Sequence, residues 1–331
     1  MNRLFLITVL LTLAICQSSQ VCNSQEKKAD DDPLAQIKQA TANLNRGQTY
    51  LLEYKFRKGQ SFKYKSEHIL TKTTSMASFT DKLSSRSQNV KVYKINNVDS
   101  LGQITFVHIN EKSKTETRLN DKDPVIYDSE SKEKPPQDYR QIAKTIGAVL
   151  FTYRIKPNGE IIERKSHFRD WDLGTGKAIV PFPKKPIPVG YTWFVGDVVT
   201  AKRADRRVVR INLRLRYRVE SVSQGLAKIS MKTEVLTPIT PKLRSQILQD
   251  LIEGERIFDI TNGRFVRSEI QWNHRVSGFE GSDSLTEYLG RYTESLVVNE
   301  SKTSRTGPVA RIAKQMEIKT IDCKPIMRRP R

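Results

Sequence analysis

The sequence predicts an α+β fold that is mainly β, made of two tandem similar units, each an antiparallel sheet with one covering helix. Three observations support this prediction. From about residue 50, β-branched and aromatic residues alternate with polar ones, turn signals separate these runs, and the same order of features occurs twice. With 331 residues, of which 37% are hydrophobic, the chain can bury an ordinary core without metals or disulfides.

The N-terminus has the pattern of a secretory signal peptide. Met1-Asn2-Arg3 carries positive charge, Leu4 to Ile15 is mostly apolar, and small or polar residues follow. Such a run is too short to span a bilayer, so we expect residues 1–24 to be a signal peptide and the mature protein to be exported, to the periplasm or outside the cell. Residues 25–49 follow as a polar segment and a short helix that begins at Asp32-Pro33.

The cysteines leave two alternatives open. Lipid attachment at Cys16 is disfavoured, because Ile15 stands where a small residue is required. Cys22 and Cys323 lie near the two chain ends and could pair in an oxidising compartment, or both could stay unpaired. If cleavage falls after Cys22, Cys323 is a lone thiol.

Two halves of the remaining chain repeat the same features. Each opens at a glycine turn, continues through strand-like segments that turn at a second glycine, and then has a proline-led helix and a strand broken by Asn-Gly, which favours hairpins. The matched positions are Gly59 and Gly190, Gly102 and Gly225, Pro136 and Pro241, and Asn158-Gly159 and Asn262-Gly263. We therefore expect β-rich repeats over 50–172 and 189–300, a proline-rich linker over 173–188 and a basic tail over 301–331.

These motifs resemble those of a group of exported two-repeat proteins from planctomycete-type bacteria. The resemblance rests on the paired Gly-x-[Ser/Thr]-aromatic openings at Gly59 and Gly190 and on Phe258-Asp259-Ile260-Thr261-Asn262-Gly263-Arg264, and it covers about residues 50–298. It implies export and a duplicated β-rich fold and supplies no activity. In architecture, a curved antiparallel sheet crossed by helices is loosely similar to periplasmic lipoprotein and lipid carriers, which says nothing of function by itself.

Motifs for catalysis or metal binding are absent or incomplete. No two histidines have metal-ligand spacing, and the one local group of possible ligands, His167 with Asp170 and Asp172, lacks distant partners. Gly174-Thr175-Gly176-Lys177 lacks the earlier glycine and the Ser or Thr of a phosphate-binding loop. We therefore expect no cofactor, no metal and no enzymatic activity. An enzyme with a dispersed site remains the less favoured alternative.

A basic hairpin face is the main candidate for binding. Residues 209–219 alternate between apolar and mostly basic side chains, and residues 227–235 alternate in the same way. If the two segments pair with Val219 opposite Ala227, their cations share one face. The candidate anion-binding residues are Arg210, Arg214, Arg216, Arg218, Lys228 and Lys232.

The formal net charge of +21 favours an anionic partner. Export makes nucleic acid an improbable one, so we expect a non-catalytic binding or carrier module for an anionic envelope component, either a lipid head group or an acidic polysaccharide. Two conditions apply: the hairpin must form, and its cations must not be neutralised by carboxylates of the protein itself. The alternative is a structural protein of the cell surface, in which this face is only solvated. The sequence does not fix the oligomeric state.

Overall fold

The computed structural model describes residues 47–168 and 179–297, all within one compact unit, Gly47–Arg331. The expected signal peptide, N-terminal helix, cysteines and basic tail lie outside the described residues. Within these ranges, no helix is long and apolar enough to cross a membrane.

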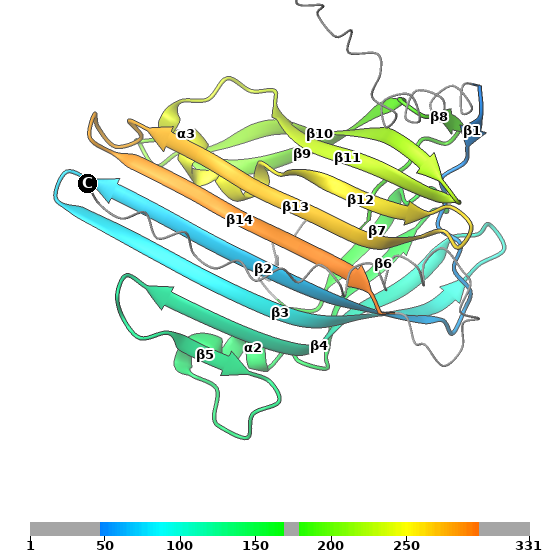
Figure 1. Cartoon of the computed structure of the whole chain (residues 1–331), viewed down its shortest axis with the longest axis horizontal. Helices are drawn as coiled ribbons and strands as arrows, with labels where there is room; N and C mark the ends of the chain where they lie inside the picture. Colours follow the sequence, from blue (N-terminus) through cyan, green and yellow to red (C-terminus); the bar gives the residue numbers. More distant parts are fainter. Residues whose placement is uncertain (1–46, 169–178, 298–331) are drawn as a thin grey trace, which may run out of the picture. The chain divides into compact units, whose positions relative to one another are not determined.

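The described chain forms one twelve-stranded sheet in which every pairing between neighbouring strands is antiparallel (Figure 1). Its order is β7-β6-β4-β3-β2-β14-β13-β12-β11-β10-β9, and β5 pairs with β4 beside this path. The strands are β2 (Ser61–Met76), β3 (Phe79–Val98), β4 (Ile104–Leu119), β5 (Val125–Asp128), β6 (Val149–Ile155), β7 (Ile161–Ser166), β9 (Thr192–Lys202), β10 (Val208–Ser223), β11 (Leu226–Val235), β12 (Glu253–Asp259), β13 (Arg264–Ser277) and β14 (Leu285–Leu296). A separate two-stranded sheet joins β1 (Thr49–Tyr50) to β8 (Ile187–Pro188).

The alternation in the sequence determines which face of each strand is buried. In β10 the side chains at odd positions from Ile211 to Val219 are almost fully buried, whereas the arginines between them are partly or fully exposed. Successive side chains of a strand point to opposite faces, so one face enters the core and the other meets water. The turns predicted at Gly102, Gly225 and the two Asn-Gly pairs all connect antiparallel neighbours.

The expectation of two units, each with its own sheet and covering helix, is wrong. The last described strand, β14, pairs with β2 over residues 285–296, so the two halves of the chain join in one sheet. A single core cluster contains residues from both halves, including Phe106 and Tyr153 from the first and Tyr217 and Phe258 from the second. Pairing β14 with β2 satisfies two strand edges that would otherwise be exposed, which favours one large sheet over two small ones.

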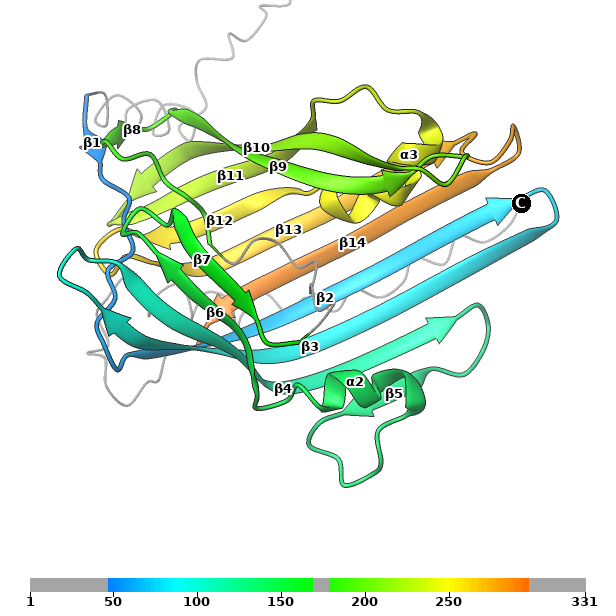
Figure 2. The same cartoon turned by 180° about the vertical axis from the view of Figure 1, so that it is seen from behind.

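The proline-led helices form but are too short to cover a sheet. The first half has two short pieces, η2 (Gln137–Tyr139) and α2 (Arg140–Ala143), and the second has α3 (Pro241–Gln246) and η3 (Leu248–Asp250). Figure 2 shows α3 near the ends of β9, β13 and β14. Because four to six helical residues span only about 6–9 Å, each helix covers a small patch.

Two irregular segments complete the core instead of helices. Residues 51–60 dock against both Asn-Gly hairpins: the Tyr54 amide donates to the Pro157 carbonyl at 2.7 Å, and the Lys55 amide donates to the Gly263 carbonyl at 3.3 Å. The described part of the expected linker, residues 179–188, buries Val180, Phe182 and Ile187 in the same core. The linker composition thus encodes an extended segment with a packed apolar side.

Candidate functional site

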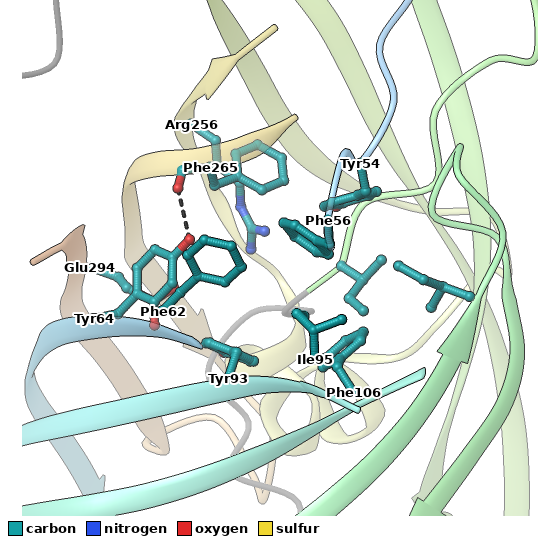
Figure 3. A pocket seen from close by; sticks show the side chains of 12 residues that line it. Tyr54, Phe56, Phe62, Tyr64, Tyr93, Ile95, Phe106, Arg256, Phe265 and Glu294 are labelled. Carbon is teal, nitrogen blue, oxygen red and sulfur yellow. Dashed lines mark hydrogen bonds between the residues drawn. The ribbon is translucent and has the colours of Figure 1, made fainter. Parts of the chain in front are cut away.

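An aromatic pocket lies on the interior face of the sheet, between the segment before β2 and strands β2, β3, β4, β12, β13 and β14 (Figure 3). Its free volume is about 50 Å³, which is room for a few waters or for one slim apolar group. Most of its wall is aromatic, with two charged residues in it. The wall includes Tyr54, Phe56, Phe62, Tyr64, Tyr93, Phe106 and Phe265, together with Arg256 and Glu294.

Strand alternation and register bring the wall together. Phe62 and Tyr64 are two residues apart on β2 and therefore share a face. Tyr93 on β3 lies opposite Phe62, and Lys91 lies opposite Tyr64. On the other side of β2, Glu294 of β14 lies opposite Ser66. The interior face of the sheet thus carries an aromatic region that borders a charged one.

Two of the pocket's tyrosines, Tyr54 and Tyr64, have structural roles. The Tyr64 hydroxyl donates to the Phe265 carbonyl at 2.9 Å, drawn as a dashed line in Figure 3, and the Tyr54 hydroxyl accepts from the Val180 amide at 3.0 Å. Burial raises the pKa of both phenols above their ordinary value. Both phenols are therefore uncharged, and the hydroxyl group of each has a hydrogen-bond partner within the protein.

A buried ion pair closes one side of the pocket. Lys91 Nζ lies 3.0 Å from Glu294 Oε2 and donates to the Tyr292 hydroxyl at 2.6 Å, and that hydroxyl donates to Glu294 at 2.6 Å. The side chains of Lys91 and Glu294 are only 7% and 16% exposed, so solvent screens this pair little.

The three groups hold one another in fixed protonation states. Burial disfavours the charge of Glu294, but attraction to Lys91 and the hydrogen bond from Tyr292 outweigh it and lower the pKa of the carboxyl. Burial likewise opposes the charge of Lys91, yet Glu294 raises the pKa of the amine. Burial and the neighbouring carboxylate raise the pKa of Tyr292 well above its ordinary value. The network is a cation, an anion and a neutral phenol.

Arg256 of β12 is the second buried cation and differs sharply from Lys91. It is 4% exposed, and Figure 3 shows its guanidinium directed into the pocket. Among the described residues, no carboxylate forms an ion pair with it, and its Nε has no hydrogen-bond partner. Its guanidinium lies over the Phe265 ring, with Cζ 5.4 Å from the ring centroid. The charges of Arg256, Lys91 and Glu294 therefore sum to one uncompensated positive charge.

Two histidines flank the ion pair and are held neutral. His108 stacks on Tyr93 with the ring centroids 4.8 Å apart, and burial, followed by the charge of Lys91, lowers its pKa to about 3. The same two causes lower the pKa of His68, which is less buried. The Nε2 atoms of both rings lack a hydrogen-bond partner in the described structure. Ser66 lies on the same face of β2 as His68, beside the Tyr292 hydroxyl.

The described residues contain no group of three His, Cys, Asp or Glu side chains placed to hold a metal. Of the local cluster suggested by the sequence, His167 Nε2 lies 2.9 Å from Thr152 Oγ1, and Asp170 and Asp172 are outside the described residues, as are Gly174 to Lys177.

The basic hairpin face is formed largely as the sequence predicts, but the register differs by two residues. Val219 lies opposite Ile229 rather than Ala227, and Arg216 lies opposite Lys232. The chain turns earlier than expected, at Gln224 and Gly225, which both have positive φ, and a one-residue bulge between Val219 and Ser221 then restores the alternation of the two strands. The six cations do share the outer face, because a shift of two residues preserves the alternation.

Carboxylates of the protein pair with five of these six cations. Arg214 and Arg216 share Glu234 at 2.7 and 3.3 Å, and Arg218 lies 3.8 Å from Glu220. Lys228 and Lys232 reach the next strand, 2.5 Å from Glu255 and 2.8 Å from Glu253. Arg210 alone has no carboxylate partner in the described structure. Six cations facing four carboxylates leave a charge of +2. An anion-binding face requires that its cations are not neutralised by the protein's own carboxylates, and this condition is poorly met.

Sequence reasoning missed Arg256 and Lys91, although a signal for each was present. Arg256 is two residues from Phe258, and Lys91 is two and four residues from Tyr93 and Ile95. In a strand such residues share a face, so each cation lies on the apolar side of its strand. A charge at a core position is the informative exception to the burial rule. Which cation has a carboxylate opposite it depends on the strand order, which the sequence pattern leaves open.

Comparison with known proteins yields no family. No family model matches the chain, and no curated protein matches it. Among solved structures, the chain is similar to the translocator domain of the autotransporter NalP from Neisseria meningitidis, with 6% identity and a TM-score of 0.28, over 79% of this chain and 94% of that one. A likeness of this size carries no argument about function.

Proposed function

We propose that the protein is an exported, non-catalytic binding protein for anionic amphiphiles, with the apolar part of the ligand in the aromatic pocket and its anionic group against Arg256. This keeps the class of partner suggested by the sequence, an anionic envelope component, and moves the site from the outer hairpin face to the interior. Export rests on the N-terminal pattern of Arg3 and residues 4–15.

The single observation that carries the proposal is the unpaired, buried guanidinium of Arg256 in an apolar cavity. Taking a cation out of water costs several kcal/mol even after the structure relaxes. Aromatic contact with Phe265 offsets part of that cost, about 2 kcal/mol for a desolvated pair. An anionic ligand supplies the missing partner, and a guanidinium binds carboxylate and phosphate through two parallel hydrogen bonds.

The narrow pocket limits how wide the apolar part of the ligand can be. The walls are mostly aromatic, and the free space is too small for a lipid with two acyl chains. A single alkyl chain is narrower, and it can enter when rings such as Tyr54 and Phe106 move apart. The favoured ligand is therefore a single-chain amphiphile with one negative charge, such as a long-chain carboxylate.

Calorimetric titration of the mature protein with dodecanoate tests the proposal. We expect dodecanoate to bind and the uncharged dodecanol to bind at least about tenfold more weakly, because only the former neutralises Arg256. Arg256→Met should remove this preference, since Met keeps the volume but not the charge. The matched control is Arg275→Met, on β13, whose side chain is 68% exposed. Equal affinity for dodecanoate in the Arg256→Met variant and the unaltered protein would refute the assignment.

A further inference from the structure

A second and larger cavity lies on the same interior face, beside α3. It has a volume of about 570 Å³ and is bordered by α3, the adjoining η3, the loop after β13, and the ends of β2, β9 and β14. This volume is within the range of small-molecule sites, about 300–1,000 Å³. Unlike the aromatic pocket, it has a polar and strongly basic lining. Its charged residues are Lys72, Lys202, Arg203, Lys242 and Glu280.

The charge of this cavity is mostly uncompensated. Glu280 is the one carboxylate in the lining, and its Oε1 lies 2.6 Å from Lys242 Nζ. Lys72, Lys202 and Arg203 have no ion-pair partner within the described ranges. Four cations and one carboxylate give a charge of +3, from three separate elements, β2, α3 and the end of β9. Cations that converge on one cavity from different elements recognise a multiply charged anion better than a monoanion.

Two hydrogen bonds with the Gln246 side chain fix the backbone at Lys202, next to Arg203. The Gln246 amide donates to the Lys202 carbonyl at 2.8 Å and accepts from the Lys202 amide at 2.8 Å. These two bonds tie the end of the edge strand β9 to α3. Because the backbone at Lys202 and Arg203 is fixed before binding, a ligand loses less free energy in ordering the site.

The rest of the lining suits a sugar. Tyr288 is 8% exposed and lines the cavity, and its hydroxyl has no hydrogen-bond partner among the described residues. Burial, followed by the charge of Asp250, raises its pKa to about 12, so this hydroxyl is a neutral donor. Gln249 adds an amide, and Phe279 adds an aromatic ring that is half-buried. Hydroxyl, amide and aromatic groups are the side chains that contact the polar edge and the apolar face of a sugar ring.

From this combination we infer that the cavity binds a phosphorylated sugar, with the phosphate among Lys72, Lys202 and Arg203 and the sugar against Tyr288 and Phe279. The site is separate from the aromatic pocket. Tyr288 and Glu294 share a face of β14 six residues apart, which is about 20 Å along a strand. The inference therefore stands whether or not the Arg256 pocket binds an amphiphile.

Calorimetry with glucose 6-phosphate, glucose and inorganic phosphate tests the inference. We expect glucose 6-phosphate to bind about tenfold more tightly than either fragment, because only it engages both halves of the cavity. The double variant Lys72→Gln/Arg203→Gln should weaken it by at least about tenfold. The control, Lys58→Gln/Lys65→Gln, removes the same charge from exposed positions outside the cavity and should leave the affinity within about twofold. Equal weakening by both double variants would indicate general charge attraction and overturn the inference.

Tyr288→Phe tests the sugar contact separately. Removing one hydroxyl should weaken glucose 6-phosphate several-fold and leave inorganic phosphate unchanged. A variant that weakens both equally, or neither, contradicts the placement of the sugar. Circular dichroism of each variant confirms that it remains folded.

The phosphorylated sugar could be free or the head group of a lipid, and vesicles distinguish these sources. The test is whether the protein sediments with phosphatidylcholine vesicles that contain phosphatidylinositol 4-phosphate. Sedimentation of the unaltered protein, and its loss in the Lys72→Gln/Arg203→Gln variant, would assign a membrane-bound head group. Binding to free glucose 6-phosphate without vesicle binding would assign a soluble ligand. Absence of both overturns the inference.

Discussion

Lys91 and Arg256 are both buried in the sheet interior, yet Lys91 has Glu294 at 3.0 Å and Arg256 has no carboxylate within ion-pair distance among the described residues. The two cations therefore contribute differently to the molecule. Lys91 belongs to a closed network with Tyr292 and Glu294, so its charge stabilises the fold around it. Arg256 has no such partner within ion-pair distance, and it acts only from farther away on Glu294, where its charge adds to that of Lys91 in lowering the pKa of the carboxyl.

Substitution of Lys91 should be strongly destabilising. Lys91→Met leaves Glu294 buried without its cation, which costs about 3–5 kcal/mol of unfolding free energy. The measurement is the urea midpoint followed by tryptophan fluorescence. The double variant Lys91→Met/Glu294→Leu should recover most of the loss, because it removes both charges together. A double variant as unstable as the single one would show that the pair itself, rather than the stranded carboxylate, carries the stability.

Substitution of Arg256 should have the opposite effect on stability. Arg256→Met removes a buried charge that has no partner, so we expect the melting temperature in the absence of ligand to stay unchanged or to rise. The same variant should lose dodecanoate binding, which would separate a ligand-binding role from a structural one. A destabilisation as large as that of Lys91→Met would mean that Arg256 is part of the fold's own electrostatics.

Acid should destabilise the protein partly through His108. Its folded pKa of about 3 lies below the unfolded value of 6.5, so the unfolded chain takes up the proton first. The stability due to the neutral ring is complete above pH 6.5 and is lost as the pH falls from 6.5 towards 3, by as much as about 4 kcal/mol. His108→Phe keeps an aromatic ring between Tyr93 and Phe151 and removes the titrating group.

The measurement for His108 is the urea midpoint from pH 7 to pH 4. We expect the slope against pH to be shallower in His108→Phe than in the unaltered protein. His167→Phe is the control, because His167 lies at an exposed position beside Thr152. Identical slopes for all three proteins would exclude His108 as a source of acid sensitivity.

Local features of this fold could be read from the sequence, and its assembly could not. Alternation identified the buried side of β10, and Asn-Gly pairs identified two hairpins, because both depend on neighbours in the chain. The union of β14 with β2 depends on which strand edges meet, and residues more than 200 positions apart pair there. The same limit applies to charge: Glu253 and Glu255 neutralise Lys232 and Lys228 only because β12 lies beside β11.

The two Asn-Gly turns should tolerate no side chain at glycine. A Cβ at Gly159 would lie 2.5 Å from the Val180 carbonyl oxygen, and one at Gly263 would lie 2.2 Å from the Lys55 amide nitrogen. Gly59 provides a matched control, since its φ of +81° is close to the +82° of Gly159 but nothing lies within 4 Å of the added atom.

Gly59→Ala should cost only the left-handed backbone penalty, about 1–2 kcal/mol. Gly159→Ala should cost about 1–3 kcal/mol more, because the backbone of residues 179–180 must shift. Thermal unfolding of the two variants gives the comparison. Equal losses would show that the turn conformation, and not close packing against the core segments, requires glycine.

The outer hairpin face should bind anions only after its own carboxylates are removed. Glu234 pairs with both Arg214 and Arg216, so Glu234→Gln frees two guanidinium groups while changing the net charge by one. We expect salt-sensitive adsorption to phosphatidylglycerol vesicles to increase in this variant beyond that of Glu116→Gln, which makes the same charge change on β4. Exposed ion pairs contribute at most about 1 kcal/mol each, so both variants should stay folded. If Arg214→Ser/Arg216→Ser/Arg218→Ser instead abolishes strong vesicle binding by the unaltered protein, the face binds anions despite its ion pairs, and the interior pocket is not the principal site.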